Sequence, residues 1–527
     1  MTMDVIGTRT LRDLVDERAL RYADKPFLVY ESAQGQVEEF CYAEARRRIL
    51  SAAAAFHEMG VRKNEAVVLL LGNSPEFVFS WLGLAWLGAI AVPANTASTA
   101  AELDHIIELS EAVGVATTPE QFSFVDTVVE HHGAVKHRVI THGHADDPSV
   151  SSMSDWWKSY PSPETALKGI DEVRSGDVAQ LVFTSGTTAR PKAVMLTHAN
   201  YLRSGIREAW ASGVGEDDRL LTALPLFHVN AQSNTVLAAM TVGGTCVLLA
   251  EYSARRFWAQ VVSHRATHLS LVAMQVRTLL AQPARESDSR SLVRRNIYAI
   301  NVSTEEKTEF ETRYGLELVN GYGLSEAMTV VTAAPVYGEK RWPSIGLPAI
   351  DRQVRVVDDN GDDVPIGTVG QIIVHGEPGR TLMKGYFKDP DATADALRGN
   401  WLFTGDNGYF DEYGYLYFYD RGKDMIKRAG ENISASEVEA VLAGHPEVEE
   451  AAVVGVPDPI RDEAVFAFVV RSPGSSVTAE DLMEYCARFL SRFKIPSVVE
   501  FADSMPKTSV GKIQKKALRG YAEGRVS

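Results

Sequence analysis

The residues 181–201, LVFTSGTTARPKAVMLTHANY, place a hydroxyl-rich loop directly after an apolar run. Backbone N–H groups and hydroxyls that converge between a strand and a helix are suited to anions, and Lys192 supplies positive charge. The segment therefore predicts a phosphate site between a strand and a helix. Its candidate ligands are Thr184, Ser185, Gly186, Thr187, Thr188 and Lys192.

This loop differs from the P-loop of common NTPases. Gly186 and Lys192 have the separation of the pattern GxxxxGK[ST], but Pro191 stands at the second glycine and Ala193 at the final Ser or Thr. Proline has no N–H to donate, so a standard P-loop is excluded. An isolated TSGT run is more often a surface loop of turn-forming residues. The full run 184–192 is more specific and favours phosphate binding.

The segments before and after this loop predict alternating strands and helices, which would position it. Residues 66–71 predict a strand, 75–87 a helix that begins with proline and stops at Gly88, and another strand follows. The runs 178–183 and 244–249 are continuously apolar, which is typical of strands buried on both faces of a parallel sheet. An α/β body is expected.

The pattern changes in the last third of the chain. From residue 370 the strands are short and alternating, and a compact α+β tail follows a boundary near residues 420–424. The fold class expected is therefore α/β: a large N-terminal domain of layered, mostly parallel sheets with helices and a small β-barrel-like part, then a small mobile α+β C-terminal domain. The tail is expected to hold helices near 436–443 and 479–490 and strands within 450–458 and 463–471.

Composition narrows the classes of function. A formal net charge of -16 disfavours a general nucleic-acid binder, which needs clustered Lys and Arg. Cys41, Cys246 and Cys486 lie far apart and suggest neither a disulfide framework nor a zinc cluster, which fits the reducing cytoplasm. The N-terminus has no signal-peptide pattern, and the most apolar stretch, 77–92, is shorter than the roughly 20 residues that span a bilayer. No membrane insertion is expected.

The run TSGTTARPK resembles the phosphate loop of the adenylate-forming superfamily, which includes acyl- and aryl-CoA synthetases, peptide-synthetase adenylation domains and luciferases. Further matching segments follow in the family's order: LPLFHVN (224–230), NGYGLSEA (320–327), WLFTGDNGYFDEYG (401–414), DRGKDMIKRAGENIS (420–434) and PKTSVGKIQKKALR (506–519). Within the family, KRWPSIGLP, YSARRFW and IYAINVSTEEK are similar to the carnitine/crotonobetaine-CoA ligase branch.

The resemblance implies an ATP-dependent acid–CoA ligase. A small carboxylic acid would attack the α-phosphorus of ATP with Mg²⁺ as cofactor, and the resulting acyl-adenylate would pass its acyl group to CoA as co-substrate. Alternatives stay open: transfer to a carrier-protein thiol, activation of nitrite in a diazotase-type reaction, or a nucleotide-binding regulator without catalysis. The acid itself is not determined, and a homodimer is a common state among such relatives.

The resemblance also implies roles for single residues. The loop residues would hold the β- and γ-phosphates and Glu326 the Mg²⁺, while Tyr322 would stack on adenine, Asp406 and Arg421 would bind ribose, and His228 would orient or gate the acyl substrate. Each has a simpler interpretation: a solvated Glu326, core packing for Tyr322, a turn former for Asp406 and a hydrogen-bonded structural histidine for His228.

Two further roles follow from the implied motion of the C-terminal domain. Lys512 would bridge the carboxylate and ATP, although it also lies in a cluster of lysines that could be a solvated tail. The domain 423–527 would then rotate against the domain 1–422 about Lys423, which could equally be a simple linker. The rotation would bring Gly430 to the channel for the pantetheine arm of CoA.

Three positions depart from the family pattern. Ala193 replaces the usual Gly after the loop lysine, and Ser325 replaces the commoner Thr but keeps a hydroxyl. The run 298–307 lacks the usual Gly-Ala-Pro element that lines the adenine and acyl pockets. The acyl pocket is therefore the region for which the resemblance says least.

Overall fold

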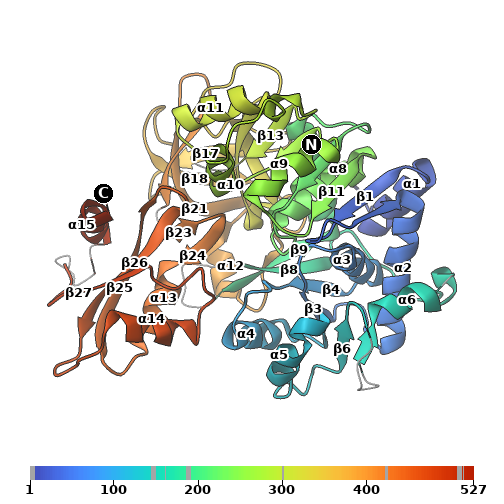
Figure 1. The fold of residues 1–527 in the computed structure, drawn as a ribbon, viewed down its shortest axis with the longest axis horizontal. Helices are drawn as coiled ribbons and strands as arrows, with labels where there is room; N and C mark the ends of the chain where they lie inside the picture. Colours follow the sequence, from blue (N-terminus) through green and yellow to red (C-terminus); the bar gives the residue numbers. More distant parts are fainter. Residues whose placement is uncertain are drawn as a thin grey trace.

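The structure is a computed structural model, and it describes residues 6–143, 150–160, 162–184, 191–298, 302–421, 425–506, 513 and 515–526. Its strands form four sheets (Figure 1). The first two sheets carry most of the helices and enclose the largest hydrophobic core, whereas the third and fourth sheets are built by the last third of the chain.

The first sheet has eight strands and is parallel from β8 through β7. Two antiparallel strands, β9 and β19, extend its edge beside β8. Its strands, in spatial order, are β19 (Gly385–Tyr386), β9 (Lys192–Thr197), β8 (Val178–Thr184), β4 (Ile90–Pro93), β3 (Ala66–Leu70), β5 (Gly114–Thr117), β6 (His137–Ile140) and β7 (Val150–Ser152).

The second sheet has nine strands and is parallel from β1 through β14. Antiparallel strands close both edges. Its strands, in spatial order, are β16 (Leu347–Pro348), β15 (Thr329–Ala333), β14 (Glu317–Leu324), β13 (Arg295–Tyr298), β12 (His268–Ser270), β10 (Arg219–Thr222), β11 (Thr245–Leu249), β1 (Pro26–Glu31) and β2 (Val37–Cys41).

The main core lies where helices from both sheets pack together. It joins side chains of α1, α2, α3 and α7 with those of β3, β9 and β11. The helices of this body are α1 (Leu11–Arg21), α2 (Tyr42–Met59), α3 (Pro75–Leu87), α4 (Ala100–Ser110), α5 (Pro119–Val129), α6 (Met153–Ser159), η1 (Pro163–Thr165), α7 (His198–Ser212), the π-helix η2 (Ala231–Leu237), α8 (Ala238–Val242), α9 (Ala254–Ser263), α10 (Ala273–Leu280), η3 (Asp288–Arg290), α11 (Thr304–Tyr314) and η4 (Ser325–Ala327).

The third and fourth sheets have five strands each. The third is antiparallel and comprises β17 (Gln353–Val357), β18 (Gly370–His375), β20 (Leu397–Arg398), β21 (Trp401–Phe410) and β22 (Leu416–Arg421), with α12 (Pro390–Ala396) beside it. The fourth comprises β23 (Met425–Arg428), β24 (Glu431–Ser434), β25 (Val448–Asp458), β26 (Asp462–Arg471) and β27 (Val498–Phe501), with α13 (Ala435–Ala443), α14 (Ala479–Ala487) and α15 (Lys515–Val526). Figure 1 shows this last region, in orange and red, beside the body.

Most sequence-based expectations for the fold are confirmed. The predicted helix from Pro75 to Leu87 matches α3, and Gly88 ends it in the left-handed region with φ 75°. The parallel, fully buried strands β3 and β11 are present as expected. The predicted helix 479–490 ends earlier, at Ala487. In the described residues, no helix is long and apolar enough to cross a membrane.

One expectation for the phosphate loop is wrong. We expected the loop to open directly into a helix, but Lys192 begins the strand β9, which pairs antiparallel with β8 and places Lys192 opposite Thr184. The hairpin pairing satisfies the backbone of KAVMLT, which includes the β-branched residues Val194 and Thr197. The helix α7 starts only at His198, where the Thr197 hydroxyl accepts from the Asn200 N–H at 3.1 Å. The predicted phosphate site therefore does not gain a helix N-terminus.

Candidate active site

A cavity of about 1420 Å³ lies where the fourth sheet meets the body of the molecule. Its wall includes the ends of β8 and β9, the turn η4, stretches of β14 and β21, and the hairpin formed by β23 and β24. Elements that are far apart in the sequence thus share one wall. The volume exceeds that of a pocket for a single small ligand, so it has room for several reacting groups.

The phosphate-loop strands form one side of this cavity. Thr184 and Lys192 both line it, at the two ends of the β8–β9 hairpin. The Lys192 ammonium lies over the ring of Tyr386, 5.0 Å from its centroid. Ser185, Gly186, Thr187 and Thr188 lie outside the described residues, so their predicted contacts with phosphate stay predictions.

Glu326 lies next to this hairpin, in η4 directly after β14. The Tyr386 hydroxyl donates to its Oε1 at 2.9 Å, which joins Glu326 to the ring beneath Lys192. Burial, followed by the neighbouring carboxylate, raises the pKa of Tyr386, so the phenol remains a donor. A carboxylate on the cavity wall beside the phosphate-loop hairpin is the hard oxygen ligand that Mg²⁺ prefers, and the residues present fit that ion.

Tyr322 and Asp406 form a buried pair on the same wall. The Tyr322 hydroxyl donates to Asp406 Oδ2 at 2.7 Å, and both side chains are less than a tenth exposed. The structure thus brings the predicted adenine and ribose residues into contact. Asp406 also faces Arg421 in the β21–β22 register. The structure describes the backbone of Arg421 and not its side chain.

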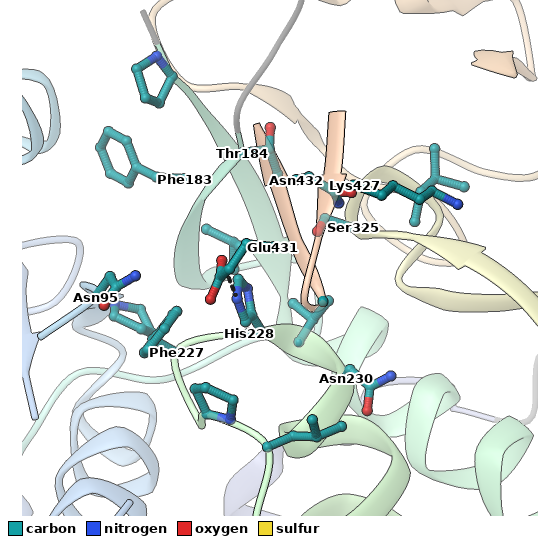
Figure 2. Close-up of a pocket in the computed structure, with 18 of the residues that line it drawn as sticks. Asn95, Phe183, Thr184, Phe227, His228, Asn230, Ser325, Lys427, Glu431 and Asn432 are labelled. Atoms are coloured by element: carbon teal, nitrogen blue, oxygen red, sulfur yellow. Dashed lines mark hydrogen bonds and ion pairs between the residues drawn. The ribbon is translucent and has the colours of Figure 1, made fainter. Parts of the chain in front are cut away.

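His228 lies in the segment after β10 and faces the fourth sheet. Its Nε2 lies 3.0 Å from Glu431 Oε2, and Figure 2 shows the two side chains pointing toward each other. Burial by itself lowers the pKa of His228, but the charge and hydrogen bond of Glu431 outweigh it and raise that pKa. Burial likewise raises the pKa of Glu431, and His228 reverses this and lowers it. The two side chains therefore form an ion pair between distant segments of the chain.

The hairpin that carries Glu431 closes one side of the cavity. Gly430, in its turn, has φ 88°, and a Cβ built there would lie 3.3 Å from the side chain of Val272. Lys494 also lines the cavity and lies between two acidic side chains, 2.7 Å from Glu102 and 2.9 Å from Glu437. The fourth sheet is thus held against the body by close contacts. Lys423 and Lys512 lie outside the described residues.

Comparison with known families explains this combination of elements. A model described as AMP-binding enzyme matches residues 15–387, and one described as AMP-binding enzyme C-terminal domain matches residues 437–512. The chain belongs to the AMP-binding enzyme family. The predicted membership of the adenylate-forming superfamily is confirmed, and so is the α/β fold class.

Several AMP-binding enzymes are similar over nearly the whole chain. A crotonobetaine/carnitine–CoA ligase of Proteus mirabilis is 40% identical over 522 residues, covering 98% of this chain and 100% of the relative. Two solved structures are similar in fold. An amide bond synthetase from Marinactinospora thermotolerans has a TM-score of 0.84 at 27% identity and covers 96% and 99% of the two chains. An o-succinylbenzoate CoA synthetase from Bacillus subtilis has a TM-score of 0.82 at 26% identity and covers 97% and 99%.

These comparisons confirm the predicted activity class. The chain is an AMP-forming, ATP-dependent acid–CoA ligase that uses Mg²⁺ as cofactor and CoA as co-substrate, and its acid substrate is a small molecule. The carrier-protein, nitrite and inactive-regulator alternatives are not favoured.

Sequence reasoning missed three side chains that shape this AMP-binding enzyme. Tyr386 contacts Glu326 from β19, and Glu431 contacts His228 from β24. Lys494 fits between two carboxylates from different regions of the chain. None lies beside its partner in sequence, and Glu and Lys are residue types that are common on surfaces. Only Glu431 lay within a recognised segment, GENIS, but nothing in that segment identified its partner.

The His228–Glu431 pair predicts a pH-dependent docking of the hairpin. Because the pKa of His228 is raised, the pair stabilises this arrangement fully below about pH 6.5 and loses that contribution as the pH rises through the raised value. The side chain of His228 is 40% exposed, so the expected change in the docked-to-undocked ratio is modest, about threefold.

Energy transfer between one dye on the body and one on the fourth sheet, measured from pH 6 to pH 9, should report this change in docking. The variant Glu431→Gln should flatten the curve, whereas the exposed control Glu449→Gln should keep it; an unchanged slope in Glu431→Gln contradicts the assignment.

Proposed function

We propose that this AMP-binding enzyme activates a small polar carboxylic acid of the crotonobetaine or carnitine kind and transfers the acyl group to CoA. The observation that carries the proposal is the shared cavity wall. It joins the phosphate-loop hairpin, Glu326, the Tyr322–Asp406 pair and His228 to the β23–β24 hairpin. The nature of the acid is supported by the curated relative, which is 40% identical over 98% of this chain.

In the first half-reaction, a carboxylate oxygen attacks the α-phosphorus of ATP, and pyrophosphate leaves with the electron pair of the broken P–O bond. Two anions must approach one another, so catalysis depends on positive charge and positioning. Lys192, Thr184 and the loop residues Ser185, Gly186, Thr187 and Thr188 are proposed to hold the β- and γ-phosphates. Glu326 is proposed to bind Mg²⁺, which neutralises phosphate charge when bound.

The nucleoside is proposed to lie against the Tyr322–Asp406 pair. The Tyr322 ring offers a face for adenine, and its hydroxyl holds the Asp406 carboxylate in place at 2.7 Å. That carboxylate can accept from ribose hydroxyls, and Arg421, opposite it in the strand register, is proposed to donate to them. Lys512 is proposed to bridge the acid and ATP and to attract both anions more strongly as they approach the transition state.

In the second half-reaction, the CoA thiolate attacks the carbonyl carbon of the acyl-adenylate, and AMP leaves. Gly430 lies in the cavity wall with no side chain of its own, and we propose that the pantetheine arm passes it. The observed arrangement, with the β23–β24 hairpin docked on His228, would then serve this step. A rotation of the domain 423–527 about Lys423, against the domain 1–422, would restore Lys512 for adenylation.

The proposal also covers the domain division, the cellular location and the oligomeric state of the enzyme. The division at residues 422 and 423 is supported by the fourth sheet, whose strands all come from residue 425 onward. A cytoplasmic location is supported by the three cysteines, all of which are free thiols. A homodimer is proposed only from its frequency among enzymes that the sequence resembles.

The proposed function is tested by pyrophosphate release from ATP and Mg²⁺ across a panel of acids and nitrite, with and without CoA. Crotonobetaine or carnitine is expected to give release and a CoA thioester identified by mass. Acetate and a long-chain fatty acid serve as matched small and large acids. Release without a thioester, or with nitrite alone, would move the function to another acceptor or oxyanion.

A further inference from the structure

A buried carboxylate lies in the cavity wall away from the nucleotide residues. Glu208 belongs to α7, lines the cavity and is only 1% exposed. An ionised group buried to this degree is costly unless donors or a cation stabilise it. The groups around the Glu208 carboxylate therefore indicate its role.

Neutral donors surround this carboxylate. The Val330 N–H donates to Oε1 at 3.1 Å, and the Thr329 hydroxyl donates to the same oxygen. The Asn234 amide, with its nitrogen toward Glu208, also donates to the carboxylate. Behind it, Asn230 accepts from the Ser270 hydroxyl at 3.0 Å. These groups point neutral dipoles at the Glu208 carboxylate, and none of them carries a positive charge.

The arginines nearby are directed elsewhere. Arg207 binds Asp351, with Nε 2.9 Å from Oδ1, and it also donates to a backbone carbonyl. Arg352 donates to backbone carbonyls, one of them Thr381 O at 2.7 Å. Within the described residues, no Lys, Arg or His nitrogen lies within 4.0 Å of the Glu208 carboxylate. Burial raises its pKa despite the donors and the field of both arginines, so an arriving cation would stabilise its charged form.

Glu208 lines the same cavity as His228, the residue proposed to orient the acyl substrate. Its partners Thr329 and Val330 follow Glu326 closely in the chain, and Asn234 follows His228 through the π-helix η2. Asn230, which Figure 2 shows beyond His228, and Asn234 both line the cavity. Apolar side chains also line the cavity, among them Ala223, Leu224, Leu271 and Val272. A π-helix at such a place is a frequent feature of functional sites.

We propose that Glu208 is the counter-charge for a cationic group on the acyl substrate and so determines the specificity of the enzyme. The inference rests on the proposed function and names the feature of the acid that the site selects. Protein donors already occupy the Glu208 oxygens. The carboxylate would therefore attract a ligand through its negative charge and not by accepting a hydrogen bond from it. That favours a quaternary ammonium, which has no N–H to donate and whose methyl groups suit the apolar walls.

The first test compares two acids that differ by one atom. Crotonobetaine carries a quaternary nitrogen, and its neutral analogue carries a quaternary carbon in the same place. The wild-type enzyme is expected to prefer the cationic acid by about a hundredfold in kcat/KM for pyrophosphate release. Glu208→Gln should remove most of that preference while KM for ATP and the rate with the neutral acid change by less than about threefold.

The matched control is Glu251→Gln, which neutralises another carboxylate of the cavity wall. Glu251 already pairs with Arg256 at 2.7 Å, so its loss should leave the preference intact. If Glu208→Gln lowers kcat/KM equally for both acids, Glu208 supports the backbone of Thr329 and Val330 only, and the inference is overturned.

A second measurement on the wild-type enzyme does not depend on a folded variant. Tetramethylammonium should compete with the acid but not with ATP, and neutral tert-butanol at the same concentration should not compete. Absence of competition overturns the inference. If other acids still form CoA thioesters, the inference fails alone and the ligase stands. If no acid forms a thioester, the proposed function fails with it.

Discussion

Replacing Lys512 with alanine is expected to lower the rate of acyl-adenylate formation by about a thousandfold. The proposed role of its ammonium is to bridge the substrate carboxylate and ATP, two anions whose mutual repulsion opposes their approach to the transition state. Removing a charge that acts mainly in the transition state should lower kcat for adenylation with little effect on KM for ATP. Thioester formation from a supplied acyl-adenylate should stay within about threefold of wild type, because the β23–β24 hairpin would then be docked in place of Lys512.

Isotope exchange between pyrophosphate and ATP measures the first step, and single-turnover formation of the thioester from synthetic acyl-adenylate measures the second. Lys516→Ala is the matched control, since it removes a charge from the same lysine cluster. A similar loss in both variants would mean that the cluster acts as a general basic surface. Equal loss of both half-reactions in Lys512→Ala would exclude two separate arrangements of the C-terminal domain.

The body of the fold was predictable because each layer leaves a local pattern. Strands buried on both faces, such as β3 and β11, are continuous apolar runs, and α3 is bounded by a proline and by Gly88. The phosphate-loop hairpin was not predicted, because the run KAVMLT is short and precedes a true helix. Its pairing with β8 is a tertiary contact that periodicity alone does not specify.

The site was predictable where chemistry is carried by motifs and not where it is carried by packing. Tyr322 and Asp406 were each identified by sequence, but their mutual hydrogen bond spans β14 and β21. Glu208 showed no signal at all, because a glutamate on a helix is usually solvated. It becomes notable only when the fold buries it beside Thr329. The environment of such residues depends on contacts between distant segments. The residues of the acyl pocket are therefore the hardest to predict from the sequence.

Replacing Gly430 with leucine is expected to slow thioester formation by at least about a hundredfold and to leave adenylation within about threefold of wild type. A Cβ at this position would already lie 3.3 Å from Val272, so a longer side chain would enter the proposed path of the pantetheine arm. Gly430→Leu should therefore slow thioester formation and spare adenylation, whereas Lys512→Ala should slow adenylation and spare thioester formation. The same assays measure both variants: isotope exchange for adenylation and single-turnover thioester formation.

Gly430 also has a left-handed backbone with φ 88°, so its replacement by leucine adds strain of about 1–2 kcal/mol whatever the channel does. Gly474 separates the two effects, because its φ is 84° but nothing lies within 4 Å of a Cβ built there. Gly474→Leu should carry a similar strain and keep both half-reactions, and the difference between the variants then measures obstruction alone. If Gly474→Leu slows thioester formation as much as Gly430→Leu, backbone strain explains the loss and the channel does not pass Gly430. If Gly430→Leu leaves thioester formation intact, the thiol reaches the adenylate by another path, and the docked hairpin is not the arrangement that transfers the acyl group.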